Sequence, residues 1–518
     1  MKMSADVTRK ALFLSSIDRF SRGVLNIPLY EYQLQPLAAV LDSIHRQRGL
    51  EFLLVFSRQS GKNEAVAHLL VYLLNIYRRR GGNMVFAAIG DGLGRGQRRL
   101  HERLNNPWNR DDWRKAAGPT RTILGRSAVV FISSHPQAAA RGETADHLLV
   151  VDELQDQDPL YVESVFTPMR AASNATAVYL GTVRSRHDAL WRKKEELERL
   201  QAADKVRRVF WAGPQQVTAA NPRYERFLQA QVARHGRYHP IIASEYFLEP
   251  LEGGGGLFPP RRLALMRGSH ARRQVPGSDG TTIALLDVGG QDEAATAALA
   301  QLANPARDYT VCTIVEVKPV PGGEEPVFHA LDVFVDQGAR FFEASAEGGA
   351  LAERLLDYLQ AWDILHLVAD ATGVGEGLAG WLSARLGRER VTEFKFSRGS
   401  KAALGAAFLA LVETGRFKYW RGDEDRPGSD GWWFWQQATH CVYDLPPGGL
   451  LQRDLRWYVP ESARVSTPQG MLPAHDDRLL SAALVAEFDR LLRERKVLLG
   501  DAKSAVLPSF DPLSELDF

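Results

Sequence analysis

Cysteine is nearly absent from this chain of 518 residues. The two cysteines, Cys312 and Cys441, are too few for a disulfide framework or a cysteine-ligated zinc site, and they suit a reducing compartment. No apolar run approaches the ~20 residues of a membrane span, and the first residues lack a long apolar signal core. The sequence therefore predicts a cytoplasmic protein without membrane association, whose site chemistry uses oxygen ligands.

A dominant charge is missing too. Lys+Arg 64 against Asp+Glu 62 gives a net charge of +2 at pH 7. This balance neither requires nor excludes a polyanionic partner, because the clustering of charge matters more than its sum. Binding of nucleic acid would therefore depend on local basic patches.

The length favours two domains, or one large domain and a smaller one. Over residues 30–250, short apolar runs alternate with helix-like stretches. The runs are EFLLVF, NMVFAAI, SAVVFISS, DHLLVVDE and TAVYLGT. This alternation predicts an α/β domain with a mainly parallel sheet wrapped by helices.

A stretch rich in glycine and proline, GGGGLFPP, follows this series. Four consecutive glycines and a proline pair fit neither a helix nor a central strand, so we expect a linker over residues 251–265. It would join a domain at 1–250 to a second α/β domain at 266–495, with a tail at 496–518. In the second domain, three apolar strand-like runs precede ILHLVAD and helical segments. This order predicts an antiparallel meander that leads into a parallel edge.

The stretch LLVFSRQSGKNEAVAHLL is typical of a strand, a polar turn and a helix. Gly61 and Lys62 at this turn supply what a phosphate cradle needs, namely backbone N–H groups at a helix N-terminus and an ammonium group. The phosphate-binding pattern G-x-x-x-x-G-K-[ST] is incomplete, since Phe56 and Asn63 occupy two signature positions. An ordinary strand-to-helix turn explains the pattern as well, so a second feature has to decide.

That feature is the apolar run DHLLVVDE, which ends in Asp152 and Glu153. An acid at the end of a strand can orient magnesium and its water, and a following glutamate can polarise the attacking water. Parallel sheets place functional groups at their C-terminal edge. The acid pair and Lys62 together therefore predict an ATPase site that binds ATP and Mg²⁺.

Four further residues fit the same sheet. Thr182 ends the run YLGT, where its hydroxyl can sense the γ-phosphate. Gln33 can read the adenine edge, or it can be a plain surface glutamine. Arg58 and Arg141 are candidates to neutralise transition-state charge, Arg141 also from a neighbouring subunit, and either can instead form a simple salt bridge. The glycines of GDGLGRG at residues 90–96 have the wrong spacing for a dinucleotide fold and predict a flexible loop.

Aspartates gather in the second domain. Asp287 and Asp370 lie at the ends of apolar strand-like runs, and Asp476 and Asp477 begin a helical segment. Acids at neighbouring strand ends and a helix start can converge on a pair of divalent ions, and hard oxygen ligands select Mg²⁺ or Mn²⁺. Each aspartate alone is also explained as a turn residue, a surface acid or, for Asp476, an N-cap.

Two other residues can assist there. Asp292 is a candidate additional ligand. Lys401 opens a helix where an ammonium group can reach a phosphate, although an exposed helix lysine is an equal explanation.

These motifs, taken in order, resemble the large terminase subunit of tailed bacteriophages, an ATPase-nuclease that packages DNA. SRQSGK is similar to that family's deviant Walker A loop, ARGETADHLLVVDE to its Walker B strand, and YLGT to its coupling motif. The segments LLDVGGQDEA, VADATGVGEGLAGWL, FKFSRGSKAALGAAFLALVETG and HDDRLLSAALVAEF follow its RNase H-like nuclease. The resemblance covers roughly residues 28–490. Asn63 departs from the family's usual Ser or Thr.

The resemblance implies a role for each site residue. The phosphate-binding loop comprises Arg58, Gln59, Ser60, Gly61, Lys62 and Asn63. Asp152 binds magnesium, Glu153 activates water, and Arg141 or Arg58 stabilises charge. Asp287, Asp370 and one of Asp476 or Asp477 bind the nuclease metals.

The resemblance also implies partners. They are double-stranded DNA, the portal protein, the small terminase subunit and further copies of the chain in a ring on the procapsid in the host cytoplasm, with a monomer as an option in solution. The basic runs at 192–194, 205–208 and 271–273 can follow a DNA backbone or be solvated helix faces. Alternatives are a helicase-nuclease and a catalytically degenerate prophage protein that binds DNA or portal; Asn63 favours the latter.

Overall fold

The computed structural model describes residues 5–116, 120–135, 143–186, 188–251, 256–277, 280–289, 309–320, 325–337, 341–343, 349–444, 454–468, 470–497 and 499. The chain divides into two compact units. Unit 1 comprises Met1–Ala230 and Pro240–Glu252, and unit 2 comprises Gln231–His239 and Gly253–Phe518. Among the helices that can be described, none is both long and apolar enough to cross a bilayer.

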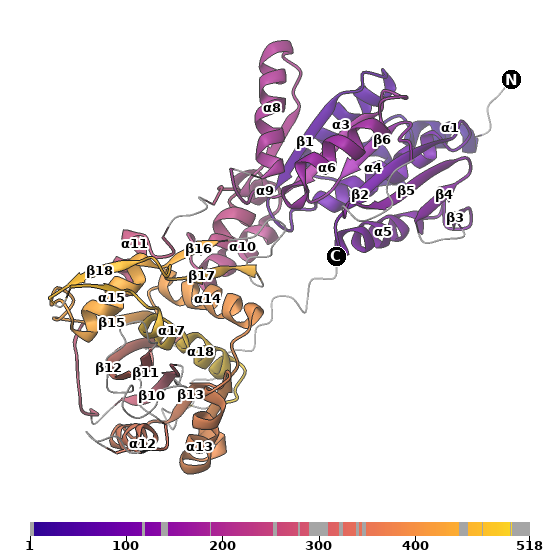
Figure 1. The fold of residues 1–518 in the computed structure, drawn as a ribbon. Coiled ribbons are helices and arrows are strands. Elements are labelled where there is room, and N and C mark those ends of the chain that lie inside the picture. Colours follow the sequence, from indigo (N-terminus) through magenta and orange to yellow (C-terminus); the bar gives the residue numbers. More distant parts are fainter. Residues whose placement is uncertain are drawn as a thin grey trace. The chain divides into compact units, whose positions relative to one another are not determined.

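Unit 1 is built on an 8-stranded sheet in the order β3-β4-β5-β2-β6-β7-β1-β8 (Figure 1). Its strands are β1 (Glu51–Phe56), β2 (Gly82–Ala88), β3 (Trp113–Lys115), β4 (Arg121–Leu124), β5 (Ser127–Ser133), β6 (Leu148–Val151), β7 (Thr176–Gly181) and β8 (Val209–Ala212). Pairing is parallel from β5 to β8, and only the two pairs made by β3, β4 and β5 are antiparallel among the strands described. The predicted mainly parallel α/β sheet is confirmed.

Helices cover this sheet because their buried faces are apolar, as in α4, where the run from Ala65 to Leu74 is buried. The helices of unit 1 are α1 (Ala5–Phe13), α2 (Ile17–Gly23), α3 (Glu31–His45), α4 (Lys62–Ile76), α5 (Asp91–Leu104), α6 (Pro159–Tyr161), α7 (Thr167–Met169), α8 (Ala189–Asp204) and α9 (Pro214–Ala220). Short segments of other helix types are the 3-10 helix η1 (Leu154–Asp156) and the π-helices η2 (Val162–Phe166) and η3 (Ile242–Tyr246). Helix α10 (Pro222–His235) contains the division between the units.

The element α5 corrects one expectation. Residues 91–96 of the glycine-rich stretch are helical rather than a flexible loop. The glycines allow a close approach to β2: a Cβ on Gly96 would lie 2.7 Å from the ring of Phe86, and one on Gly92 would lie 3.3 Å from Cβ of Ala88. The glycines here serve helix packing, which their spacing alone does not reveal.

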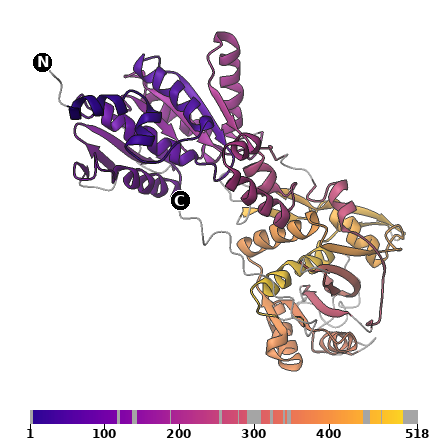
Figure 2. The same cartoon turned by 180° about the vertical axis from the view of Figure 1, so that it is seen from behind.

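Unit 2 is built on a 7-stranded sheet in the order β14-β13-β10-β11-β12-β15-β9. Figure 2 shows the ribbon from behind, with the C-terminal helices of this unit in orange and yellow. Its strands are β9 (Arg267–Ala271), β10 (Thr281–Asp287), β11 (Tyr309–Lys318), β12 (Val327–Gln337), β13 (His366–Asp370), β14 (Val391–Phe394) and β15 (Phe417–Arg421). Strands β10, β11 and β12 form the predicted antiparallel meander, and β13 joins β10 in parallel. This is the RNase H-like order that was expected.

The helices of unit 2 cover both faces of this sheet. They are α11 (Pro260–Met266), α12 (Leu351–Ala361), α13 (Gly375–Leu386), α14 (Arg398–Glu413), α15 (Asp430–His440), α17 (Asp477–Ala483) and α18 (Val485–Arg493), with the turn η4 (Arg388–Arg390). Ala284 and Leu286 of β10 share a core with α12 and α13. On the opposite face, Ser481 of α17 donates its hydroxyl to the carbonyl of Leu285 at 2.8 Å. Successive side chains of β10 thus point to opposite faces of the sheet.

Two small hairpins complete unit 2, β16 (Val442–Asp444) with β17 (Arg456–Tyr458) and β18 (Arg464–Thr467) with β19 (Gly470–Pro473). Helix α11 begins at Pro260, inside the stretch expected to be a linker. Proline fits there because the first helical residue needs no hydrogen-bond partner for its nitrogen. The domain limits themselves stay predictions.

Candidate ATPase and nuclease sites

The loop between β1 and α4 is held by the protein's own side chains. The hydroxyl of Tyr32 donates to the carbonyl of Ser60 at 2.8 Å, and Nε2 of Gln33 donates to the carbonyl of Gly61 at 2.9 Å. Gln59 and Gly61 have φ of 60° and 84°. The loop therefore makes a tight left-handed approach to the N-terminus of α4, where backbone N–H groups can meet an anion.

Gln33 lies directly beneath this loop and is buried. Its Oε1 accepts the backbone N–H of Tyr30 at 2.9 Å, in addition to the bond from Nε2 to Gly61. The amide thus ties the loop to the start of α3. Reading of adenine by Gln33 stays a prediction, and it would use the remaining N–H of this amide.

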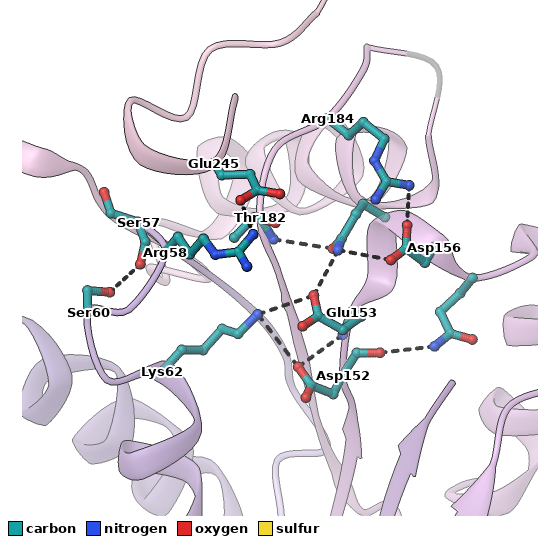
Figure 3. A network of polar contacts seen from close by, with 12 residues as sticks. Ser57, Arg58, Ser60, Lys62, Asp152, Glu153, Asp156, Thr182, Arg184 and Glu245 are labelled. Atoms are coloured by element: carbon teal, nitrogen blue, oxygen red, sulfur yellow. Dashed lines mark hydrogen bonds and ion pairs between the residues drawn. The ribbon is translucent and has the colours of Figure 1, made fainter. Parts of the chain in front are cut away.

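Lys62 meets the acid pair across the sheet (Figure 3). Its Nζ lies 3.6 Å from Oδ1 of Asp152 and 3.7 Å from Oε2 of Glu153. In the sheet, β7 separates β1 from β6, so the C-terminal ends of these parallel strands bring lysine and acids to one edge. The structure therefore gathers the three residues on which the predicted ATPase site depends.

Burial and charge set the protonation of these groups. Burial lowers the pKa of Lys62, but the carboxylates of Glu153 and Asp152 outweigh it and hold that pKa above its ordinary value. Lys62 lowers the pKa of Glu153, whereas burial raises the pKa of Asp152. Glu153 is thus kept ionised, as a group that accepts a proton must be.

Asn63 carries an unsatisfied atom in the first turn of α4. Its Oδ1 is buried and has no hydrogen-bond partner among the residues that the structure describes. A buried amide oxygen without a partner costs free energy, so it favours a ligand that supplies a donor or a cation. An amide oxygen, like the carboxylate of Asp152, is the type of ligand that a hard cation such as Mg²⁺ or its water prefers.

Of the two candidate arginines, the structure describes Arg58. Arg58 forms an ion pair with Glu245 and remains half exposed, with 52% of its side chain accessible. Its backbone is fixed as well, because its N–H donates to the carbonyl of Glu245 at 2.8 Å. Arg141 lies outside the described residues. The charge-stabilising role of either arginine stays a prediction.

A polar network next to the acids was not anticipated from the sequence. Gln155 in η1 donates Nε2 to Oε2 of Glu153 at 2.8 Å and accepts the backbone N–H of Thr182 at 3.2 Å on its Oε1. Gln157 donates Nε2 to the carbonyl of Asp152 at 2.9 Å. Thr182 therefore lies beside the acid pair, although sensing of the γ-phosphate by its hydroxyl stays a prediction.

Arg95 is a second residue that sequence reasoning missed. It is exposed in the second turn of α5, and its charge acts on both Asp152 and Glu153. One and two turns further along, Arg99 and Arg103 pair with Glu64, which follows the phosphate loop. The signal was the period of four among these arginines, which places them on one helix face.

The second candidate site begins with two strand ends. Asp287 ends β10 and Asp370 ends β13, and these neighbouring strands are parallel, with Leu286 paired to Ala369. The next residue of each strand is therefore an aspartate on the same edge of the sheet. Asp370 also accepts the backbone N–H of Thr372 at 2.9 Å.

Helix α17 brings the other acids to this edge. Asp476 precedes the helix and Asp477 is its first residue. Oδ2 of Asp477 accepts the backbone N–H of Tyr309 at 3.1 Å, which fixes the helix start against β11. Nζ of Lys401 lies 3.4 Å from Oδ2 of Asp476, so this lysine neutralises part of the local charge.

The pKa of Asp287 reflects its closeness to the other acids. Its pKa is raised well above the ordinary value by burial and by the charges of Asp477, Asp476 and Asp370, whereas Lys401 acts in the opposite direction. An excess of buried carboxylates is the donor set that suits Mg²⁺ or Mn²⁺.

A search for metal-holding groups covers the described ranges alone. Within them, no three His, Cys, Asp or Glu side chains stand together as such a group. Asp292 lies outside the described residues.

The basic runs make mostly internal ion pairs. Lys193 pairs with Glu51 and Glu196, and Arg208 pairs with Asp204. Further pairs are Lys194 with Glu198, Arg272 with Asp332 and Asp430, and Arg273 with Glu316. These side chains thus have acidic partners within the protein, and contact of the runs with DNA stays a prediction.

No family model matches the chain, and no curated protein matches it. Solved structures that match include the large terminase of the thermophilic bacteriophage D6E, at 11% identity and a TM-score of 0.48, covering 89% of this chain and 99% of that one. The HK97 bacteriophage large terminase matches at 12% identity and a TM-score of 0.38, covering 92% and 99%.

The large terminase nuclease of the thermophilic phage G20c with bound magnesium matches at 16% identity and a TM-score of 0.30, covering 45% of this chain and 97% of that one. All three structures are thus large terminases or their nuclease, the family that the motifs resemble. Identities and TM-scores are low, so the function proposed below rests on the two sites of this chain.

Proposed function

We propose that this chain is a DNA-packaging motor of the large terminase type, which hydrolyses ATP to move double-stranded DNA and cuts it with a metal-dependent nuclease. The observation that carries the motor is the position of Lys62, with Nζ 3.6 Å from Asp152 and 3.7 Å from Glu153. A lysine at a helix N-terminus that faces a carboxylate pair is the arrangement that phosphoryl transfer requires.

In this proposal, Lys62 and the loop amides bind the ATP phosphates. To do so, the ammonium group of Lys62 leaves the carboxylates of Asp152 and Glu153. Asp152 and Oδ1 of Asn63 would hold magnesium or its water. Bound magnesium would neutralise charge on the phosphates. Glu153 orients the attacking water and accepts its proton as the water oxygen bonds to the γ-phosphorus. The bond from that phosphorus to the bridging oxygen breaks, and ADP leaves with phosphate as the second product. Arg58 or Arg141 stabilises the charge on the transferred group.

The nuclease half of the proposal rests on Asp287 and the three aspartates Asp370, Asp476 and Asp477, whose charges add to burial in raising the pKa of Asp287. Asp287, Asp370 and one of Asp476 or Asp477 would hold Mg²⁺ or Mn²⁺. Such ions would activate a water and stabilise the leaving oxygen of a DNA phosphodiester. Lys401, whose Nζ lies 3.4 Å from Asp476, would attract the DNA phosphate.

The remaining elements of the proposal come from the resemblance. The partners are DNA, portal protein, a small terminase subunit and further copies of the chain around the portal vertex of a procapsid in the host cytoplasm. A helicase-nuclease would need a second motor domain. In the second unit of this chain, the residues described instead form a sheet whose edge carries aspartates.

A second candidate function is a degenerate protein that binds DNA or portal without turnover. Asn63 favours it, because an amide oxygen is a weaker partner for magnesium than the usual hydroxyl group. The orphaned Oδ1 shows that this position lacks a protein partner among the described residues, which is compatible with either function.

A crossed pair of variants tests the proposal. Glu153→Gln is expected to abolish ATP hydrolysis and retain metal-dependent nicking of plasmid DNA, because the two sites are separate. Asp370→Ala is expected to do the reverse. A parent chain that neither hydrolyses ATP nor nicks DNA in Mg²⁺ or Mn²⁺ would support the degenerate protein and overturn the motor.

A further inference from the structure

Gln155 occupies the space between the acid pair and the end of β7. The side chain is buried, with 7% of the residue exposed. Its two amide ends are used for different partners, since Nε2 donates to Oε2 of Glu153 at 2.8 Å and Oε1 accepts the N–H of Thr182 at 3.2 Å. One carboxamide therefore links the carboxylate expected to activate water to the backbone after β7.

The surroundings of Gln155 are shaped to admit this amide. A Cβ on Gly181 would lie 2.4 Å from its Oε1 and 2.2 Å from Cδ1 of Leu190, so only glycine leaves room there. On the other side of Gln155, Glu153 has φ of 50° and ψ of 51°. This left-handed conformation is unfavourable in free energy for a residue that has a side chain. The surrounding fold stabilises this conformation, which lets the carboxylate face both Lys62 and Gln155.

The contacts continue beyond Gln155. Its Nε2 also lies 3.4 Å from Oδ2 of Asp156, which forms an ion pair with Arg184. The carbonyl of Arg184 accepts the N–H of Leu251 at 2.7 Å. A series of polar contacts thus connects Glu153 to Leu251, and all of these residues belong to unit 1.

We propose that Gln155 is a positioning residue of the ATPase: it aims the Glu153 carboxylate at the attacking water and transmits the position of that carboxylate to the backbone of Thr182. This inference rests on the proposed ATP hydrolysis. When Lys62 turns to the phosphates, Glu153 loses its nearest cation, and the amide of Gln155 keeps a donor on the carboxylate. The carboxylate then stays oriented toward the water during turnover.

The test uses the full chain and the substitution Gln155→Met, which preserves length and burial but removes both amide functions. We expect kcat for ATP hydrolysis to fall on the order of ten-fold with little change in KM, because the amide acts on the catalytic carboxylate and not on the substrate.

Gln201→Met is the matched control. Oε1 of Gln201 accepts the N–H of Arg208 at 2.8 Å, so the same chemical change removes a backbone contact far from the acids along the chain. This variant is expected to keep the kcat and KM of the parent. A Gln155→Met chain whose kcat matches that of the parent would overturn the inference while the parent's ATPase still stands. Absence of hydrolysis in the parent would overturn the proposed function and this inference with it.

Hydrogen exchange supplies a readout independent of turnover. Addition of ATPγS with Mg²⁺ is expected to change the exchange of the Thr182 amide in the parent, because Gln155 couples that amide to Glu153. The change is expected to be lost in Gln155→Met. Equal responses in both chains would contradict the link between Glu153 and Thr182.

Discussion

Oδ1 of Asp152 lies 3.6 Å from Nζ of Lys62, although the two residues follow different strands of the sheet. Both side chains are nearly buried, with 1% and 11% accessible. Without a nucleotide, the acids thus serve as the counter-charge of the lysine. A bound phosphate would compete for that lysine, so nucleotide binding and release of the acids are linked in this account.

Gly61 gives the first prediction. Its φ of 84° disfavours any side chain, and a Cβ there would lie 2.5 Å from Nε2 of Gln33. Gly61→Ala is therefore expected to destabilise the chain by about 1 kcal/mol or more and to weaken ATP binding. Denaturant unfolding and binding of a fluorescent ATP analogue measure the two effects.

Gly399 is the control for that substitution. It lies in the first turn of α14 without a positive φ, and a Cβ there meets open space. Gly399→Ala is expected to be neutral or slightly stabilising. Equal losses in both variants would show that the conformation of Gly61 has no special part in the loop.

Asn63 gives the second prediction. Asn63→Thr places a hydroxyl where the phosphate-loop pattern has one, and it removes the orphaned Oδ1. The Mg²⁺ concentration for half-maximal ATP hydrolysis is expected to fall several-fold, and Asn63→Ala is expected to raise it. A magnesium titration of the ATPase measures both. An Asn63→Ala chain with the magnesium dependence of the parent would mean that this side chain does not contact the ion.

Asp287 gives the third prediction. Its raised pKa means that the folded chain binds this proton more tightly than the unfolded chain. Stability of the parent should therefore fall as pH rises above the ordinary aspartate value of about 4. In metal-free buffer at pH 7, Asp287→Asn is expected to be more stable by about 1–2 kcal/mol.

Divalent metal should reverse this order. Mg²⁺ or Mn²⁺ that binds the folded site raises the melting temperature of the parent, and Asp287→Asn should lose most of that response together with DNA nicking. Thermal melts in chelator and in metal test this. A parent chain that melts at the same temperature under both conditions would count against a metal site at these aspartates.

Asp156 gives the fourth prediction. Burial raises its pKa from 3.8 to about 6, against the opposing effect of Arg184. The unfolding free energy of the parent should therefore fall between about pH 4 and pH 6, by at most about 3 kcal/mol from this group. Asp156→Asn should flatten that part of the stability curve. Parallel curves for the two chains would contradict the assignment of this titration to Asp156.

Much of the fold could be predicted from the sequence because the buried parallel strands are continuous apolar runs. The runs of β1, β2, β5, β6 and β7 were all identified. Strand β3 has the sequence WRK and β4 has the sequence RTIL. These strands are too short to show a hydrophobic pattern, and they form by pairing with their neighbours in the sheet. Helix α5 was missed because its glycines are typical of a loop, whereas here they pack against Phe86.

The sites were partly predictable for a related reason. Chemistry at the end of an apolar run is visible in one sequence, and this gave Lys62, Asp152, Asp287 and Asp370. Contacts of Gln155 are not visible, because a glutamine after an acid pair reads as an ordinary polar turn. The bond from Gln155 to Thr182 depends on how β6 and β7 pair, which is a property of the folded sheet.

The most direct test of the central claim is phosphate release from ATP by the parent chain and by Lys62→Met in the presence of Mg²⁺. Methionine keeps the buried stem of Lys62 but lacks the ammonium group that faces Asp152 and Glu153. The account predicts turnover in the parent and a loss of about a hundred-fold or more in Lys62→Met. Equal phosphate release by the two chains, or none from the parent, would contradict it.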